Sequence, residues 1–122
     1  ANGKQISVSG TKTVYNSLFV TGFPYEESEL DRFLGIYKHL LRNSRGVRRF
    51  GSAAIDLCYV AAGKFEAFYE VGLNPWDVAA GGLLVKEAGG AVTTITNTND
   101  WLFGKSLCAS NGQIHSELLA LM

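Results

Sequence analysis

The chain has 122 residues, 47% of them hydrophobic, which is enough for one domain with a buried core. Its 11 basic and 11 acidic residues balance, and this argues against a nucleic-acid-binding or polybasic membrane surface. No apolar stretch approaches the roughly 18–20 residues that a membrane-spanning helix needs. Cys58 and Cys108 lie in apolar stretches and are predicted to be buried free thiols, so we expect a reducing, cytoplasmic location.

The first residues predict a strand that has lost its partner. Residues 1–9 alternate polar and apolar side chains around Ile6 and Val8, which is typical of a half-buried strand. Asn2-Gly3 is a hairpin-turn signal, and a hairpin turn needs a strand on its other side. We therefore expect that a segment preceding Ala1 is missing.

A strand, a helix and a second strand are predicted next. Residues 15–23 are apolar, rich in strand formers and ended by glycine and proline. Residues 26–42 place apolar side chains three and four positions apart, which predicts a helix with one buried face. Residues 43–46 form a loop, and residues 47–50 predict a short strand.

Residues 53–62 predict a second helix, and residues 65–71 the strand that follows it. Ser52 is a good N-cap for this helix, and Gly63 ends it. The helix is apolar almost all round, so we expect it to be buried between two layers.

Residues 74–88 predict a third helix, with Asn74 as its N-cap and a proline at its first position. Gly81 and Gly82 lie inside it, although each glycine costs about 1 kcal/mol relative to alanine in a helix. Their presence indicates a neighbouring element or a ligand that approaches the helix closely.

The remainder completes an alternating pattern. Residues 91–95 and 107–109 predict strands, and residues 112–121 a helix that Asn111 caps. Alternating strands and helices with short connections predict an α/β fold, a mostly parallel or mixed sheet with helices on both faces in three layers. His39 and His115 lie at no metal-ligand spacing and are expected on the surface.

Two acids meet at one junction of a strand and a helix. Glu70 lies near the end of the strand, and Asp77 lies in the first turn of the following helix. Ligands of open α/β sheets bind at the carboxyl ends of the strands. Each acid also has a structural interpretation, because the helix dipole favours Asp77 and the rim of the sheet would solvate Glu70. Trp76, between them, is expected to pack as a wedge.

The stretch RRFGSAAIDLCYVAAGKFEAFYEVGLNPWDVAAGGLLVKEAGG, residues 48–90, resembles the C-terminal signature region of the inositol monophosphatase family. These are magnesium-dependent, lithium-sensitive phosphomonoesterases. The sequence WDVAAG followed by EAGG is the most specific part, and the likeness is weaker over residues 2–25 and 107–119. The resemblance implies that residues 1–122 are the C-terminal half of a two-domain phosphatase whose N-terminal metal-binding domain is absent here.

The resemblance also implies roles for individual residues. Asp77 corresponds to a ligand of Mg²⁺, an ion that prefers hard oxygen ligands. Glu70 corresponds to the acid that contacts a hydroxyl of a sugar-alcohol substrate. Further substrate contacts are implied for Ser52, Ala53, Ala54 and Ser17. Ser52 has the alternative interpretation of a helix cap alone.

The other metal ligands of the family come from an upstream glutamate and a DPxDGT-type loop, and these residues contain neither motif. One carboxylate cannot hold the two metal ions of phosphoester hydrolysis. We therefore expect the catalytic residues upstream of residue 1 and an isolated chain that is inactive. Arg45, Arg48 and Arg49 could attract phosphate or form a solvated basic loop.

The sequence thus predicts part of a magnesium-dependent phosphatase whose partner is a small phosphate ester such as inositol monophosphate. Family analogy adds a homodimer, and neither nucleic acid nor membrane is an expected partner. One alternative is a sugar-bisphosphate phosphatase of the same superfamily. Another is a non-catalytic α/β binding module that uses the helix starts at Ser52 and Asn74 as a pocket for oxygen ligands.

Overall fold

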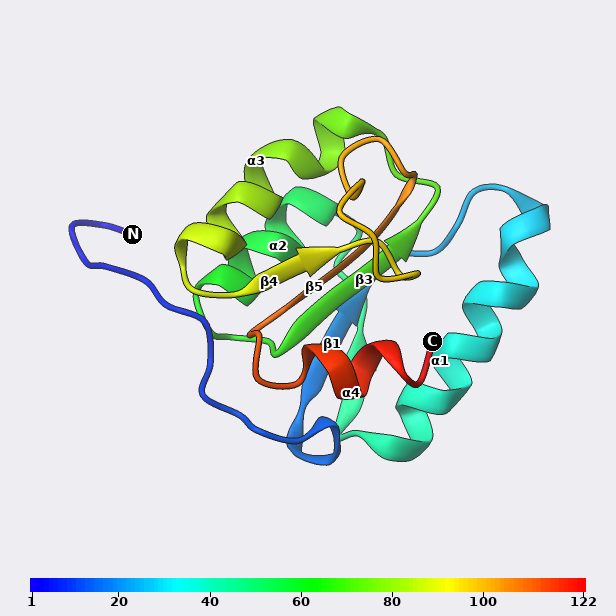
Figure 1. Ribbon diagram of the computed structural model, residues 1–122, viewed down its shortest axis with the longest axis horizontal. Helices are drawn as coiled ribbons and strands as arrows, with labels where there is room; N and C mark the ends of the chain where they lie inside the picture. Colours follow the sequence, from blue (N-terminus) through cyan, green and yellow to red (C-terminus); the bar gives the residue numbers. More distant parts are fainter.

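The computed structural model describes residues 1–122 as a five-stranded mixed sheet with helices on both faces (Figure 1). The strand order is β2-β1-β3-β5-β4; β1 runs parallel to β2 and β3, whereas β5 is antiparallel to β3 and β4. The strands are β1 (Leu18–Thr21), β2 (Gly46–Arg48), β3 (Ala67–Val71), β4 (Ala91–Thr93) and β5 (Ser106–Ser110). The predicted α/β fold with a mixed sheet is confirmed.

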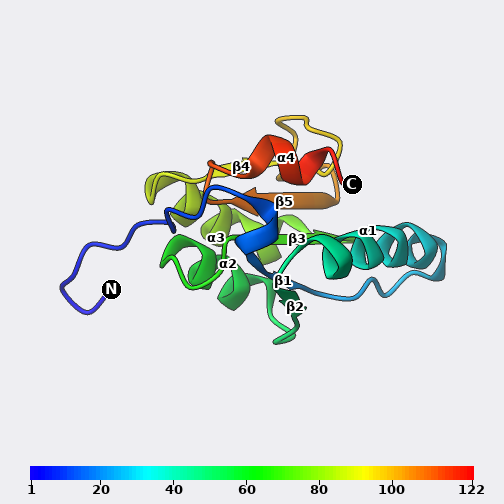
Figure 2. The ribbon, with the colours of Figure 1, turned by 90° about the horizontal axis from the view of Figure 1, so that it is seen from below.

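The helices form two layers on opposite faces of the sheet (Figure 2). One face is covered by α1 (Leu30–Asn43) and α4 (His115–Leu119), and the other by α2 (Ala53–Ala61) and α3 (Pro75–Glu87). None of these helices is both long and apolar enough to span a bilayer.

Alternation along β3 divides its side chains between the two layers. Tyr69 packs with the cluster that includes α1 and α4, whereas Phe68 packs with the cluster that includes α2 and α3. Because successive side chains of a strand point to opposite faces, Glu70 lies on the same face as Phe68. The sheet therefore directs this acid towards the layer formed by α2 and α3.

The two glycines inside α3 have the close neighbours that the sequence indicated. A β-carbon at Gly81 would lie 2.6 Å from Cβ of Leu57 on α2. A β-carbon at Gly82 would lie 2.6 Å from Cζ3 of Trp101, in the loop between β4 and β5. Close packing against α2 and Trp101 explains why α3 contains glycine at these positions.

The prediction of a strand over residues 1–9 is wrong. Asn2 and Gly3 do form a turn, with φ of 51° and 76° and a 2.9 Å hydrogen bond from the N–H of Lys4 to the carbonyl of Ala1. The segment after it is irregular, and the N–H of Val8 donates to the carbonyl of Ala88 rather than to a neighbouring strand. Without a ladder of such bonds, the alternating pattern does not produce a strand.

Two predicted elements begin with short 3₁₀ turns. The strand expected over residues 15–23 is shorter, since Val14–Asn16 form a 3₁₀ turn before β1. The helix expected from residue 26 starts as a 3₁₀ turn over Glu27–Glu29 and becomes α-helical at Leu30. The final helix, α4, covers only the middle of the predicted range.

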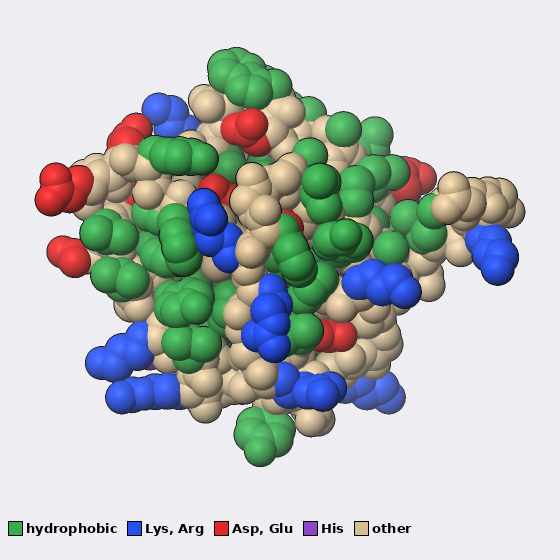
Figure 3. All heavy atoms as spheres, turned by 180° about the vertical axis from the view of Figure 1, so that it is seen from behind, with side chains coloured by type: hydrophobic (Ala, Val, Ile, Leu, Met, Phe, Trp, Pro, Cys, Tyr) green, Lys and Arg blue, Asp and Glu red, His purple; other side chains and the backbone are tan.

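The outer face of α2 is exposed, contrary to the prediction that this helix is buried all round. Ile55 is 50% exposed, and Cys58 is exposed rather than buried. The ring of Tyr59 lies 5.7 Å from that of Phe50, which precedes α2. Figure 3 shows apolar side chains over much of the face seen from behind, with arginine and lysine side chains between them. The 122 residues supply no further layer to cover α2.

His115 is buried, which corrects the expectation of a surface residue. Its Nδ1 lies 2.8 Å from Oγ of Ser110, and its Nε2 lies 3.0 Å from Oγ1 of Thr93. Burial lowers the pKa of His115. The expectation holds for His39, which is exposed, and the predicted burial of Cys108 is confirmed, with its pKa raised to about 12.

Candidate functional site

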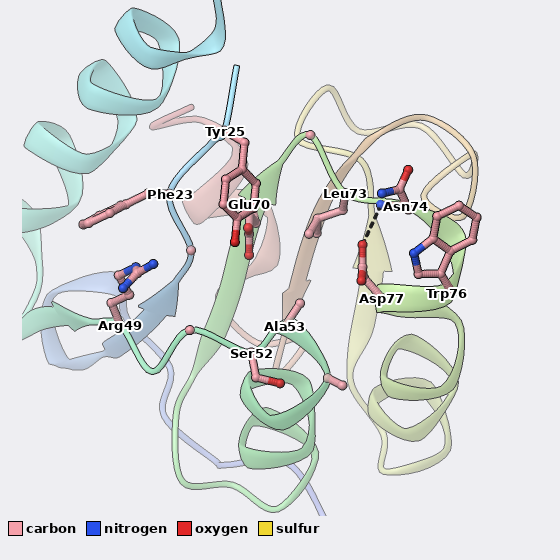
Figure 4. Close-up of a pocket in the computed structure, with 14 residues that line it drawn as sticks. Phe23, Tyr25, Arg49, Ser52, Ala53, Glu70, Leu73, Asn74, Trp76 and Asp77 are labelled. Carbon is pink, nitrogen blue, oxygen red and sulfur yellow. Dashed lines mark hydrogen bonds between the residues drawn. The ribbon is translucent and has the colours of Figure 1, made fainter. Parts of the chain in front are cut away.

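A cavity of about 330 Å³ opens where β1 and β3 end and α2 and α3 begin (Figure 4). Glu70 and Asp77 both border it, as does the segment Ser52, Ala53 and Ala54. The structure thus brings together five of the six residues that the sequence analysis selected.

The parallel part of the sheet produces this arrangement. Since β1 and β3 are parallel, their carboxyl ends lie at the same edge, and the segments that leave them border the cavity. Both α2 and α3 start at that edge. The first-turn N–H groups of a helix lack intrahelical partners, so two sets of donors flank the cavity.

Glu70 is the most enclosed acid of the cavity wall, with 7% of its surface exposed. Burial, with smaller effects of the charges of Asp56 and Asp77, raises the pKa of Glu70 to about 7, against the opposing effect of Arg49. The carboxylate takes part in none of the side-chain hydrogen bonds of the structure. It is therefore an acceptor that a ligand hydroxyl could use.

Asp77 lies in the first turn of α3, and one of its oxygens is engaged there. Its Oδ2 accepts a 2.9 Å hydrogen bond from the backbone N–H of Asn74. This bond leaves Oδ1 for another partner. Both interpretations from the sequence are thus compatible, because the acid that stabilises the helix start also presents an oxygen to the cavity.

The donor set fits one part of a metal site. Asp77 offers a hard oxygen of the kind that Mg²⁺ prefers. No group of three or more histidine, cysteine, aspartate or glutamate side chains in the 122 residues is arranged to hold a metal ion. Asp77 can therefore contribute a ligand to such a centre, but the 122 residues do not form the centre by themselves.

Ser52 caps α2 only weakly. Its Oγ accepts from the N–H of Ile55 over 3.5 Å, which is long for a hydrogen bond. The backbone N–H groups of Ala53 and Ala54 belong to the first helical turn and border the cavity. Small side chains at these two positions leave the helix start accessible.

Ser17 does not lie with the other predicted site residues. It precedes β1, whereas the cavity opens at the opposite end of this strand, about 13 Å away for a four-residue strand. Ser17 is fully buried, and its hydroxyl donates a 2.8 Å hydrogen bond to the carbonyl of Thr13. The structure thus places it in the packing at the start of β1.

Trp76 lines the cavity but is not packed into the core. Its side chain is 80% exposed and is directed away from Glu70 in Figure 4, so the expectation of a packing wedge is wrong. The Pro75–Asp77 turn places the indole on the outside of the helix start.

Arg49 belongs to the cavity wall. The sequence had allowed either a phosphate contact or a solvated basic loop for this residue. Its guanidinium carbon lies 4.8 Å from the centre of the Phe23 ring, so an aromatic face supports this cation beside the acids. It is the one cationic side chain among the residues that line the cavity.

Asp56 is a functional candidate that the sequence analysis did not select. It is fully buried, and neither carboxylate oxygen has a hydrogen-bond partner. Burial raises the pKa of Asp56 to about 6, although the charge of Arg49 acts in the opposite direction. The available signal was its position as the one charged residue of an otherwise apolar helix.

The whole chain, residues 1–122, matches the model of the inositol monophosphatase family. It is 42% identical to Nus factor SuhB of Pseudomonas aeruginosa over 97% of this chain and 45% of that protein. It is 41% identical to the inositol-1-monophosphatase of Caulobacter vibrioides over 95% of this chain and 46% of that protein.

Solved structures give the same result. The inositol monophosphatase of Anabaena (Nostoc) sp. PCC 7120 superimposes with a TM-score of 0.92 at 42% identity, over 98% of this chain and 48% of that chain. The chain spans about half the length of the curated relatives it matches.

Proposed function

Because the chain belongs to the inositol monophosphatase family, we propose that the whole protein is a magnesium-dependent phosphomonoesterase. Its substrate would be inositol monophosphate or a similar sugar-alcohol phosphate. The observation that carries this proposal is that Glu70 and Asp77 border one cavity with the start of α2. A volume of about 330 Å³ is within the range of small-molecule sites.

Each residue of the cavity has a distinct task under this proposal. Asp77 would hold Mg²⁺, and the bound ion would supply Lewis-acid activation of water and of the phosphoryl group. Glu70 would accept hydrogen bonds from hydroxyls of the sugar alcohol. The N–H groups of Ala53 and Ala54 would donate to substrate oxygens, with Ser52 orienting the helix start.

The position of the chain in the whole protein is part of the proposal. The match to about half of each relative supports the interpretation of residues 1–122 as its C-terminal α/β domain. The remaining metal ligands and the catalytic water site would come from the rest of the protein. The 122 residues alone are then expected to release no phosphate, since no group of three or more possible ligands among them is arranged to hold a metal ion.

Further properties follow from family analogy alone and stay predictions. They are inhibition by lithium, self-association as a homodimer and a cytoplasmic location. Light scattering of the whole protein would determine the oligomeric state, and activity in the presence of lithium would test inhibition.

A sugar-bisphosphate phosphatase is the alternative within the superfamily. Arg49 supports it, because a second phosphate group needs a cation in the cavity. A second role is suggested by the relative named Nus factor SuhB. If both roles exist, a variant without phosphatase activity would still complement a bacterial strain that lacks its own Nus factor SuhB.

Phosphate release by the whole protein tests the main proposal. We expect Mg²⁺-dependent hydrolysis of inositol 1-phosphate at a higher kcat/KM than fructose 1,6-bisphosphate. The reverse order would favour the bisphosphatase. An absence of hydrolysis of both esters, in a folded protein supplied with Mg²⁺, would favour the non-catalytic binding module.

A further inference from the structure

Gly22 lies directly after β1, where the structure leaves no space for a side chain. A β-carbon at this position would overlap Cδ, Oε1 and Oε2 of Glu70. Any residue other than glycine would therefore displace the carboxylate from the place that it occupies in the cavity wall.

The backbone itself does not require glycine at this position. Gly51 and Gly72, which also border the cavity, have φ of +86° and +79°, a region that side chains rarely tolerate. Gly22 lies outside that region. Its contact with Glu70 is what excludes a side chain.

The register of the sheet places the two residues side by side. Thr21 is the partner of Tyr69, so the next residues along the two parallel strands are Gly22 and Glu70. The hydroxyl of Thr21 donates a 2.6 Å hydrogen bond to the carbonyl of Tyr69 and holds the two strand ends together. Side chains at positions 22 and 70 would share the sheet face covered by α2 and α3.

The contact between Gly22 and Glu70 explains how Glu70, near the carboxyl end of β3, is 93% covered. The carboxylate lies against the backbone of Gly22, so it forms part of the wall and leaves the cavity volume free. A side chain at position 22 would push the carboxylate into the cavity, where it would meet substrate oxygens, or towards Asp77, where it would meet a second negative charge.

We propose that Gly22 is a specificity-determining residue, which sets the position of the Glu70 carboxylate and thereby the preference for phosphate esters of polyhydroxylated rings. The inference rests on the proposed function. Gly22 is a positioning residue, since it acts through Glu70 rather than through a side chain of its own.

The test compares Gly22→Ala with wild type in the whole protein. The readout is the ratio of kcat/KM for inositol 1-phosphate to kcat/KM for p-nitrophenyl phosphate, which lacks ring hydroxyls. We expect this ratio to fall roughly tenfold or more, because a hydrogen bond to a charged acceptor is misplaced. Gly35→Ala on α1 is the matched control, because nothing lies within 4 Å of its β-carbon and its φ is permissive. That variant should keep the wild-type ratio.

A double-mutant cycle distinguishes coupling to Glu70 from a general effect. In Glu70→Ala, the atoms that would clash are absent, so adding Gly22→Ala should change neither the substrate ratio nor Tm. Gly22→Ala alone should change Tm, because the displaced carboxylate changes its contacts and its solvation. Equal effects of Gly22→Ala in both backgrounds, or an unchanged ratio and Tm in the wild-type background, would overturn the inference.

The two proposals fail in different ways. If the wild-type protein hydrolyses neither ester, the proposed function fails. The Tm cycle then still decides whether Gly22 and Glu70 are coupled. If wild type prefers inositol 1-phosphate and Gly22→Ala keeps that preference, only the inference about Gly22 fails.

Discussion

Oδ2 of Asp77 accepts a 2.9 Å hydrogen bond from the backbone N–H of Asn74, so the carboxylate that we propose as a metal ligand also stabilises the start of α3. One oxygen holds the helix start, and the other remains for a cation. The structural bond thereby orients the functional oxygen, and substitutions can separate the two tasks.

Asp77→Asn should abolish Mg²⁺-dependent phosphate release and leave the fold intact. The amide oxygen can still accept the bond from Asn74, whereas the negative charge for the metal is lost. Asp77→Ala should lose activity as well and cost about 1 kcal/mol in the free energy of unfolding, the usual effect of removing a capping group. Urea unfolding and calorimetric Mg²⁺ titration of both variants would measure this. Full activity of Asp77→Asn would exclude Asp77 as a ligand.

The affinity for inositol 1-phosphate should depend on the ionisation of Glu70. The pKa of this group is raised to about 7, chiefly by burial. An ionised carboxylate accepts hydrogen bonds more strongly than a neutral one, so KM should fall as the pH rises through about 7. Glu70→Gln should lose this step and retain any step that belongs to the substrate phosphate. A KM profile of Glu70→Gln identical to that of wild type would contradict the role of Glu70.

Asp56→Asn should stabilise the protein above pH 6 and have little effect below pH 4. Burial raises the pKa of Asp56 from 3.8 to about 6, so the folded state holds its proton more tightly than the unfolded state does. The stability from this proton is fully present below pH 3.8 and is lost as the pH rises to about 6. We expect a gain of up to roughly 3 kcal/mol at pH 8, because the neutral amide avoids the cost of ionising a buried carboxyl whose pKa is raised to about 6.

Chemical denaturation of wild type and Asp56→Asn at pH 4 and pH 8 would measure this difference. The charge of Asp56 raises the pKa of Glu70, so both proteins should also carry Glu70→Gln, and the difference between them then reports on Asp56. A variant that is less stable than wild type at pH 8 would show that Asp56 has a partner that stabilises its charge.

Gly81→Ala should destabilise the protein even though alanine favours helices. The new β-carbon would lie 2.6 Å from Cβ of Leu57, and this overlap costs more than the helix propensity gains. We expect a loss of roughly 1–3 kcal/mol. Gly35→Ala on α1, where nothing lies within 4 Å, should instead gain up to about 1 kcal/mol. Thermal unfolding of both variants would show opposite shifts in Tm if α2 and α3 pack as described.

The free energy of unfolding should decrease as the pH falls below 6.5, because His115 is buried as a neutral ring. On one side of the ring, Oγ of Ser110 accepts from the N–H of Gly112 and can donate to Nδ1 of His115. On the other side, Oγ1 of Thr93 donates to the carbonyl of Thr94 and therefore accepts from Nε2–H of His115. These bonds satisfy the neutral imidazole. Burial lowers the pKa of His115, so its contribution is present above pH 6.5 and is lost as the unfolded state takes up a proton.

His115→Gln should not show this acid-dependent loss, which unfolding curves between pH 5 and pH 8 would test. Imidazole NMR signals of the folded protein should show a neutral ring at pH 6.5. A pKa of His115 at or above 6.5 would contradict the assignment.

The sequence by itself determined the order of elements and the central part of the site. Hydrophobic periodicity and capping preferences involve only a few neighbouring positions. The N-caps Ser52 and Asn74 and the helices that end at glycine could therefore be identified from the sequence. Glu70 and Asp77 are separated by a single turn, and local geometry was enough to predict that both lie at one edge of the sheet.

Only the tertiary structure decided which distant residues meet. The approach of Gly22 to Glu70 depends on the pairing of β1 with β3, and the burial of Asp56 depends on which face of α2 meets the sheet. Ser17 was assigned to the site on the resemblance to the family alone, and strand direction placed it at the opposite end of β1. Pairing register and layer packing join residues tens of positions apart, and no local pattern in the chain encodes those distances.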